Sequence, residues 1–195
     1  MKRSSAVRAG LAAITSGLLL GLLTGCSGTT SAAPVAYGGP FDGKDQQPIN
    51  SGQVCVPVPT GGSVAFGGDD LDNYGDQKAV IDKVTLLDPH GLHLVTAFLL
   101  GKRSTDYGYS SYPPPADFLS AGWAARQPAV GATLPPEGVK ERIVSAYNLV
   151  TVVKVTGTTH VGMRAVLVDY HVGTKKYRWH NLISLQVETK KKQCS

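Results

Sequence analysis

Short segments rich in Val, Ile, Thr and aromatic residues dominate the chain after residue 52, and no convincing amphipathic helix interrupts them. They lie at 79–88, 92–100, 143–156, 160–172 and 176–188, with shorter candidates at QVCVPV and SVAFG. In the last segment Ile183, Leu185 and Val187 alternate with polar residues, the pattern of a sheet with one solvated face. The sequence therefore predicts an all-β fold.

The number and spacing of these segments predict a single immunoglobulin-like β-sandwich of about seven strands over residues 53–195. In the segment around Asp169, one face carries Val166, Val168, Tyr170 and Val172, while the other carries Ala165, Leu167, Asp169 and His171. Gly173 supplies the turn of a hairpin in VGTKKY, and PHG (89–91) predicts a second hairpin-like break.

The first 25 residues have the form of a secretory signal peptide. Lys2, Arg3 and Arg8 form a basic start without acids, and an apolar stretch from Ala9 to Leu23 follows. That stretch is shorter than the roughly 20 apolar residues of a spanning helix. It predicts export of the chain.

Leu23-Thr24-Gly25-Cys26 resembles the bacterial lipobox, in which small residues precede a cysteine that is lipidated and becomes the first mature residue. The resemblance implies that Cys26 carries the acyl chains and that two or more chains hold the protein stably in a bilayer. We therefore expect a lipid anchor on the extracellular face of the cell membrane. Residues 26–52, rich in Gly, Ser, Thr, Pro and Ala, predict a disordered spacer.

The formal net charge of the chain bears on whether nucleic acid is a partner. Without residues 1–25 the chain keeps 16 basic and 14 acidic residues, a formal net charge of +2 in place of +5. That balance does not favour nucleic acid as a partner, and the predicted compartment does not offer it.

Two cysteines remain after lipidation, Cys55 and Cys194. In an oxidising compartment an even pair predicts one disulfide, which here would join the start of the domain to its end.

Residues 101–141 are far longer than a normal connection and carry several aromatic residues. Phe118 and Trp123 are interpreted first as side chains that cover the end of the sandwich. The alternative is a contact loop for a partner, with Tyr107, Tyr109, Tyr112 and Trp123 as the candidate residues.

The acidic segment GGDDLDNYGD is compared with a calcium loop and does not fit one. A loop starting at Asp70 would place Tyr74 at its fifth position and Ile81 at its twelfth, where a bidentate glutamate is needed. A solvated turn between strands is the better interpretation.

Five histidines, His90, His93, His160, His171 and His180, make a copper or zinc protein the alternative function, with Met163 as a possible soft ligand. HExxH and CxxC are absent, so no metal ligand set and no cofactor are predicted. A serine hydrolase elbow GxSxG is absent too, and Asp169 and His171 have no identifiable serine partner. No catalytic residue is predicted, and a cryptic enzyme is the third hypothesis.

The order of the Cys55 segment, the block GGDDLDNYGDQKAVIDKVTLLDPHGLHL, a Pro- and Trp-bearing middle and the late VDYHVGTKKYR resembles uncharacterised secreted and lipid-anchored proteins of actinobacteria. The resemblance implies a small extracellular β domain and no catalytic residues. We expect a membrane-anchored, non-catalytic interaction or ligand-binding module whose partner is an envelope protein or a small ligand.

Overall fold

The computed structural model describes residues 36–42, 52–101, 108–115, 121–136, 147–190 and 194, all within one compact unit. The elements are β1 (Ala36–Tyr37), β2 (Gly52–Pro57), β3 (Ser63–Leu71), β4 (Ala79–Leu87), β5 (Leu92–Gly101), β6 (Tyr109–Ser111), α1 (Ala121–Ala124), β7 (Gln127–Pro128), β8 (Thr133–Leu134), β9 (Tyr147–Val155), β10 (Val161–Met163), β11 (Ala165–Val172), β12 (Lys175–His180) and β13 (Ile183–Glu188). The predicted all-β, sandwich-like fold is confirmed. Most strands beyond the expected seven are only two or three residues long.

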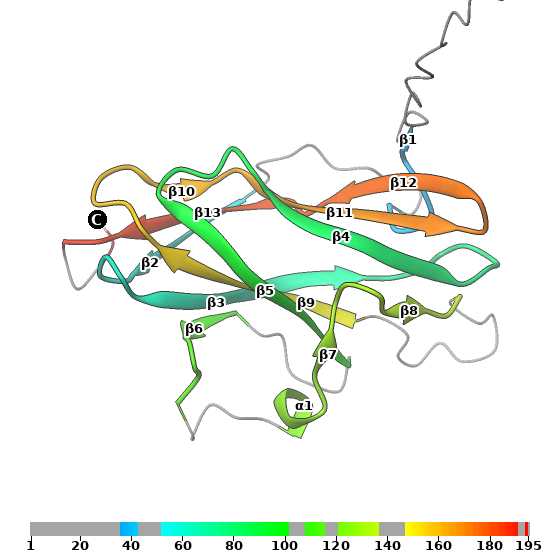
Figure 1. Cartoon of the computed structure of the whole chain (residues 1–195), viewed down its shortest axis with the longest axis horizontal. Coiled ribbons are helices and arrows are strands. Elements are labelled where there is room, and N and C mark those ends of the chain that lie inside the picture. Colours follow the sequence, from blue (N-terminus) through cyan, green and yellow to red (C-terminus); the bar gives the residue numbers. More distant parts are fainter. Residues whose placement is uncertain are drawn as a thin grey trace, which may run out of the picture. The chain divides into compact units, whose positions relative to one another are not determined.

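The strands form three hydrogen-bonded sheets, ordered β1-β12-β11-β4-β8, β10-β13-β2 and β6-β3-β9-β5-β7 (Figure 1). Most neighbours are antiparallel, but β1 pairs with β12 and β2 pairs with β13 in parallel. The first described strands therefore lie beside the last ones.

β10 and β11 are separated at Arg164, and β12 and β13 are separated at Asn181. At these two breaks the β10-β13-β2 sheet continues the β1-β12-β11-β4-β8 sheet. Asn181 is fully buried; its side-chain oxygen accepts a hydrogen bond from the Val166 amide at 2.6 Å, and its amide nitrogen donates to the Ile183 carbonyl at 2.9 Å. His90 bridges to Gly162 on the other side of the break. These bonds satisfy backbone groups that the interruption leaves without a ladder partner.

The core lies between this layer and the β6-β3-β9-β5-β7 sheet. The expected faces are found: Val166, Val168 and Tyr170 are buried, while Asp169 and His171 are partly exposed. Opposite them, alternate residues of β9 such as Leu149 and Val153 belong to the same core cluster.

A short segment ahead of β2 is part of the domain, which corrects the prediction that the spacer extends to residue 52. Phe41 is buried and stacks on Tyr170 with ring centroids 3.8 Å apart. The Phe41 amide donates to the Tyr170 hydroxyl at 3.1 Å. A side chain at Gly39 would overlap that hydroxyl, so the close approach needs glycine. The Gly-, Ser- and Pro-rich composition of 26–52 gave no indication that one aromatic residue anchors this segment. Residues 26–35 and 43–51 lie outside the described part.

We expect alkaline pH to destabilise the domain through Tyr170. Burial, the largest cause, raises the pKa of Tyr170 well above the usual value of about 10, so the folded state favours the neutral phenol. Its contribution to stability is therefore complete below pH 10 and is lost progressively as the pH rises above that value. Urea unfolding of the native chain and of Tyr170→Phe across this range measures it. The stability difference between the two proteins should shrink with rising pH; a constant difference would contradict the expectation.

Two local expectations are corrected by the topology. Pro89, His90 and Gly91 do not form a hairpin, because β4 and β5 belong to different sheets; the segment is a crossover between layers. Asp69 and Asp70 lie in β3 rather than in a turn, and the turn begins at Asp72. By contrast, the β11–β12 hairpin is confirmed, with Gly173 at φ 58°.

A second apolar cluster covers the outer face of the β6-β3-β9-β5-β7 sheet. It contains Ala65, Leu100, Trp123, Val150 and Val152, with Phe98 and Tyr112 packed against it. The Trp123 ring meets Phe98 edge-on at 5.9 Å, and the Arg126 guanidinium lies 4.8 Å from the Trp123 ring centroid. The excursion after β5 thus covers a sheet face that would otherwise be apolar and open.

No helix within the described residues has the length and apolarity needed to cross a membrane.

Candidate functional site

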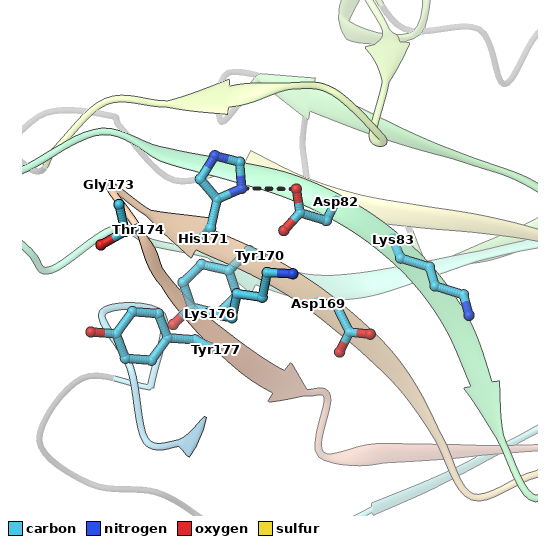
Figure 2. A pocket seen from close by; sticks show the side chains of 9 residues that line it. All are labelled: Asp82, Lys83, Asp169, Tyr170, His171, Gly173, Thr174, Lys176 and Tyr177. Atoms are coloured by element: carbon cyan, nitrogen blue, oxygen red, sulfur yellow. Dashed lines mark hydrogen bonds and ion pairs between the residues drawn. The ribbon is translucent and has the colours of Figure 1, made fainter. Parts of the chain in front are cut away.

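A pocket of about 730 Å³ opens on the outer face of β4, β11 and β12 (Figure 2). Its volume falls within the usual range of small-molecule sites, about 300–1,000 Å³. The pocket is lined by Asp82, Lys83, Asp169, Tyr170, His171, Gly173, Thr174, Lys176 and Tyr177. The charged members project from the face opposite the core, whereas Tyr170 and Tyr177 lie on the core side.

A β-bulge in β4 concentrates charged groups here. In the β4–β11 ladder Asp169 pairs with Lys83 and Tyr170 pairs with Ile81. Asp82 therefore has no backbone ladder partner on β11. Consequently Asp82 and Lys83, although consecutive, are both exposed, whereas Ile81 and Val84 on either side are buried. Such bulges re-aim side chains and are frequent beside functional sites.

The bulge brings Asp82 to His171. The imidazole Nδ1 lies 2.8 Å from the Asp82 carboxylate oxygen, and both side chains remain more than a third exposed. This bond fixes the ring orientation and leaves Nε2 available to a ligand.

Asp169 is neutralised by another partner. Arg178 Nε donates to Asp169 Oδ1 at 2.6 Å, and Nη2 donates to Oδ2 at 2.9 Å. The two residues face each other across β11 and β12. Hydrogen bonds that the guanidinium makes, first to the Asp169 carboxylate and then to the Tyr37 hydroxyl, raise the pKa of Arg178 above its already high normal value. A bidentate guanidinium–carboxylate pair is geometrically rigid, so one side of the pocket is well ordered.

Lys83 and Lys176 differ from these groups, because neither ammonium has an ion-pair partner among the described residues. Figure 2 shows the Lys176 side chain reaching from β12 across β11. Lys83 extends along the opposite side from β4. The pocket thus holds one carboxylate matched by a guanidinium, a second hydrogen-bonded to an imidazole, and two ammonium groups without an ion-pair partner among the described residues.

The pairing of Asp169 and His171 differs from what their shared strand face suggested. The sequence placed Asp169 and His171 on one strand face, and they are there, but each is paired with a residue of a neighbouring strand. Among the described residues, the bond recorded for the His171 ring is the one to Asp82. Asp82, Lys83 and Lys176 were missed; two consecutive charged residues within the strand pattern 79–88 were the available indication of a bulge.

Of the predicted contact aromatics, the structure brings Tyr112 and Trp123 together, with ring centroids 6.4 Å apart, within the second apolar cluster. Tyr107 and Phe118 lie outside the described residues. Tyr109 is half exposed on β6, while Tyr112 is partly buried against the second apolar cluster. Trp123 is only 6 % exposed and packs within the second apolar cluster, which agrees with its first interpretation as a covering side chain and not with the contact alternative.

The cysteine pairing is resolved by the fold. Cys55 of β2 and Cys194 form a disulfide with their Cα atoms 6.0 Å apart. Cys26 lies outside the described residues, so its lipidation stays a prediction.

The histidines are distributed over several elements. His90 is in the crossover after β4, His93 in β5, His160 before β10, His171 in β11 and His180 in β12. Over the ranges that the structure describes, no three His, Cys, Asp or Glu side chains gather as a metal ligand set. The copper or zinc alternative stays a prediction.

Comparisons with known proteins found no matching protein-family model, no matching curated protein and no matching solved structure.

Proposed function

We propose that the chain is a lipid-anchored, extracytoplasmic β domain that binds a ligand without transforming it, and that the pocket on β4, β11 and β12 is the binding site. The observation that carries this proposal is the bulge at Asp82 and Lys83, which gathers oriented polar groups around a cavity. The aromatic loop is a weaker candidate, since Trp123 is used for packing.

The anchor rests on the segment Leu23–Cys26 and on the basic, apolar leader before it. We expect the native chain expressed in a bacterial host to incorporate a labelled fatty acid and to fractionate with membranes. Cys26→Ser should remove the label and release the folded domain, since two or more acyl chains supply the stable attachment. Cys55→Ser is the matched cysteine control and should stay labelled. Labelling that persists in Cys26→Ser would contradict the anchor.

Ligand binding is tested with soluble probes of three chemistries: inorganic phosphate, N-acetylglucosamine and a short neutral peptide. At least one should cause saturable NMR shifts at His171 and Thr174 but not at Tyr109. Asp82→Asn should weaken that binding about tenfold, because His171 loses the carboxylate that orients it, an effect of about 1.4 kcal/mol. Asp88→Asn is the matched control, since its carboxylate pairs with Arg164 outside the pocket. Absence of shifts with all three probes would refute the pocket as the site.

A further inference from the structure

We infer that the pocket on β4, β11 and β12 binds the phosphate of an anionic lipid headgroup in the bilayer that carries the anchor. This inference rests on the proposed function, which supplies the anchor and the pocket, and adds the chemical class of the ligand.

The charges in the pocket favour an anion. Asp169 is matched by the bidentate Arg178, and Asp82 is engaged by His171. Lys83 and Lys176 have no such partner in the described chain, so their ammonium groups retain their attraction for an incoming negative charge.

The types of donor fit a phosphate in particular. Lys176 and Lys83 approach from the two strands on either side of β11; Lys176 lies opposite His171, and Lys83 lies opposite Asp169. The two ammonium groups present hydrogen-bond donors from separate directions, which suits the several acceptor oxygens of a phosphate. A carboxylate has only two oxygens in one plane and would leave donors unused.

The position of the pocket points to the bilayer as the source. Ala36 pairs with Tyr177, a residue that lines the pocket, and β1 runs parallel to β12 away from the β11–β12 turn. Ala36 is ten positions after Cys26, which limits the reach between them to about 36 Å even when fully extended. The anchor therefore keeps this pocket within a few nanometres of the headgroups, at a high effective concentration.

The test uses the processed chain from residue 26 onward with Cys26→Ser, so that binding does not depend on acyl chains. Two probes are compared: glycerol phosphate, followed by NMR shifts of His171 and Thr174, and vesicles of phosphatidylcholine with or without phosphatidylglycerol, followed by cosedimentation. The test variant is Lys83→Ala/Lys176→Ala. The control is Lys154→Ala/Lys190→Ala, which removes the same charge from exposed positions outside the pocket.

We expect saturable binding of glycerol phosphate and selective binding to vesicles with phosphatidylglycerol. The pocket double variant should weaken both at least tenfold, and the control less than about twofold. Equal losses in the two variants would show a general charge effect and overturn the inference. Binding of glycerol phosphate without vesicle binding would overturn the bilayer as source. No phosphate binding, combined with N-acetylglucosamine shifts at the same residues, would overturn the ligand class and leave the proposed function standing.

Discussion

Loss of the Cys55–Cys194 disulfide should lower the free energy of unfolding by about 4–5 kcal/mol, the chain-entropy value for a closed loop of this size. The two cysteines are 139 residues apart in sequence, so the bond restricts almost the whole unfolded domain. It also ties β2, which lies at the margin of its sheet, to the end of the chain.

Urea unfolding of Cys55→Ser/Cys194→Ser against the oxidised chain measures this effect, both in a Cys26→Ser background so that no free thiol complicates the comparison. The oxidised chain treated with a reductant is the second arm, because it removes the crosslink without changing the side chains at 55 and 194. A loss below about 1 kcal/mol in both arms would mean that the unfolded chain is already restricted by residual structure.

Phe41→Ala should cost about 3–5 kcal/mol, the usual range for a buried phenylalanine. Phe41 is 4 % exposed and stacks on Tyr170, which is itself fully buried. Removing the ring opens a void against Tyr170 and loosens the hydrogen bond between the Phe41 amide and the Tyr170 hydroxyl.

The matched control is Tyr109→Ala, which truncates a half-exposed aromatic residue on β6. It should change stability by less than about 1 kcal/mol. Thermal or urea unfolding of both variants makes the comparison. If Phe41→Ala were as mild as the control, residues 36–42 would not belong to the cooperative unit, and the domain would begin at β2.

Sequence reasoning predicted the layers better than the connections between them. The alternation in 165–172 and 183–188 identified the buried faces, because a strand with one wet face leaves a period of two in its sequence. The segment 89–91 misled, since a turn-forming tripeptide does not show whether the next strand stays in the same sheet or crosses to the opposite one.

Only part of the candidate site could be predicted from the sequence. His171 and Asp169 were placed on one face correctly, but their true partners, Asp82 and Arg178, come from neighbouring strands. Pairing register between strands is a tertiary property, and one bulged residue shifts it. Phe41 was missed for a different reason: a single anchoring aromatic in a Gly- and Pro-rich segment leaves no periodic pattern.

The parallel pairing of β1 with β12 and of β2 with β13 has a consequence for the order of folding. Each of these amino-terminal strands pairs with a strand that follows it by roughly 130–140 residues. Such non-local contacts slow folding. A chain that crosses a membrane amino terminus first cannot complete this edge until its last strands have emerged. We therefore expect the margin that begins the domain to pair only after β12 and β13 are available.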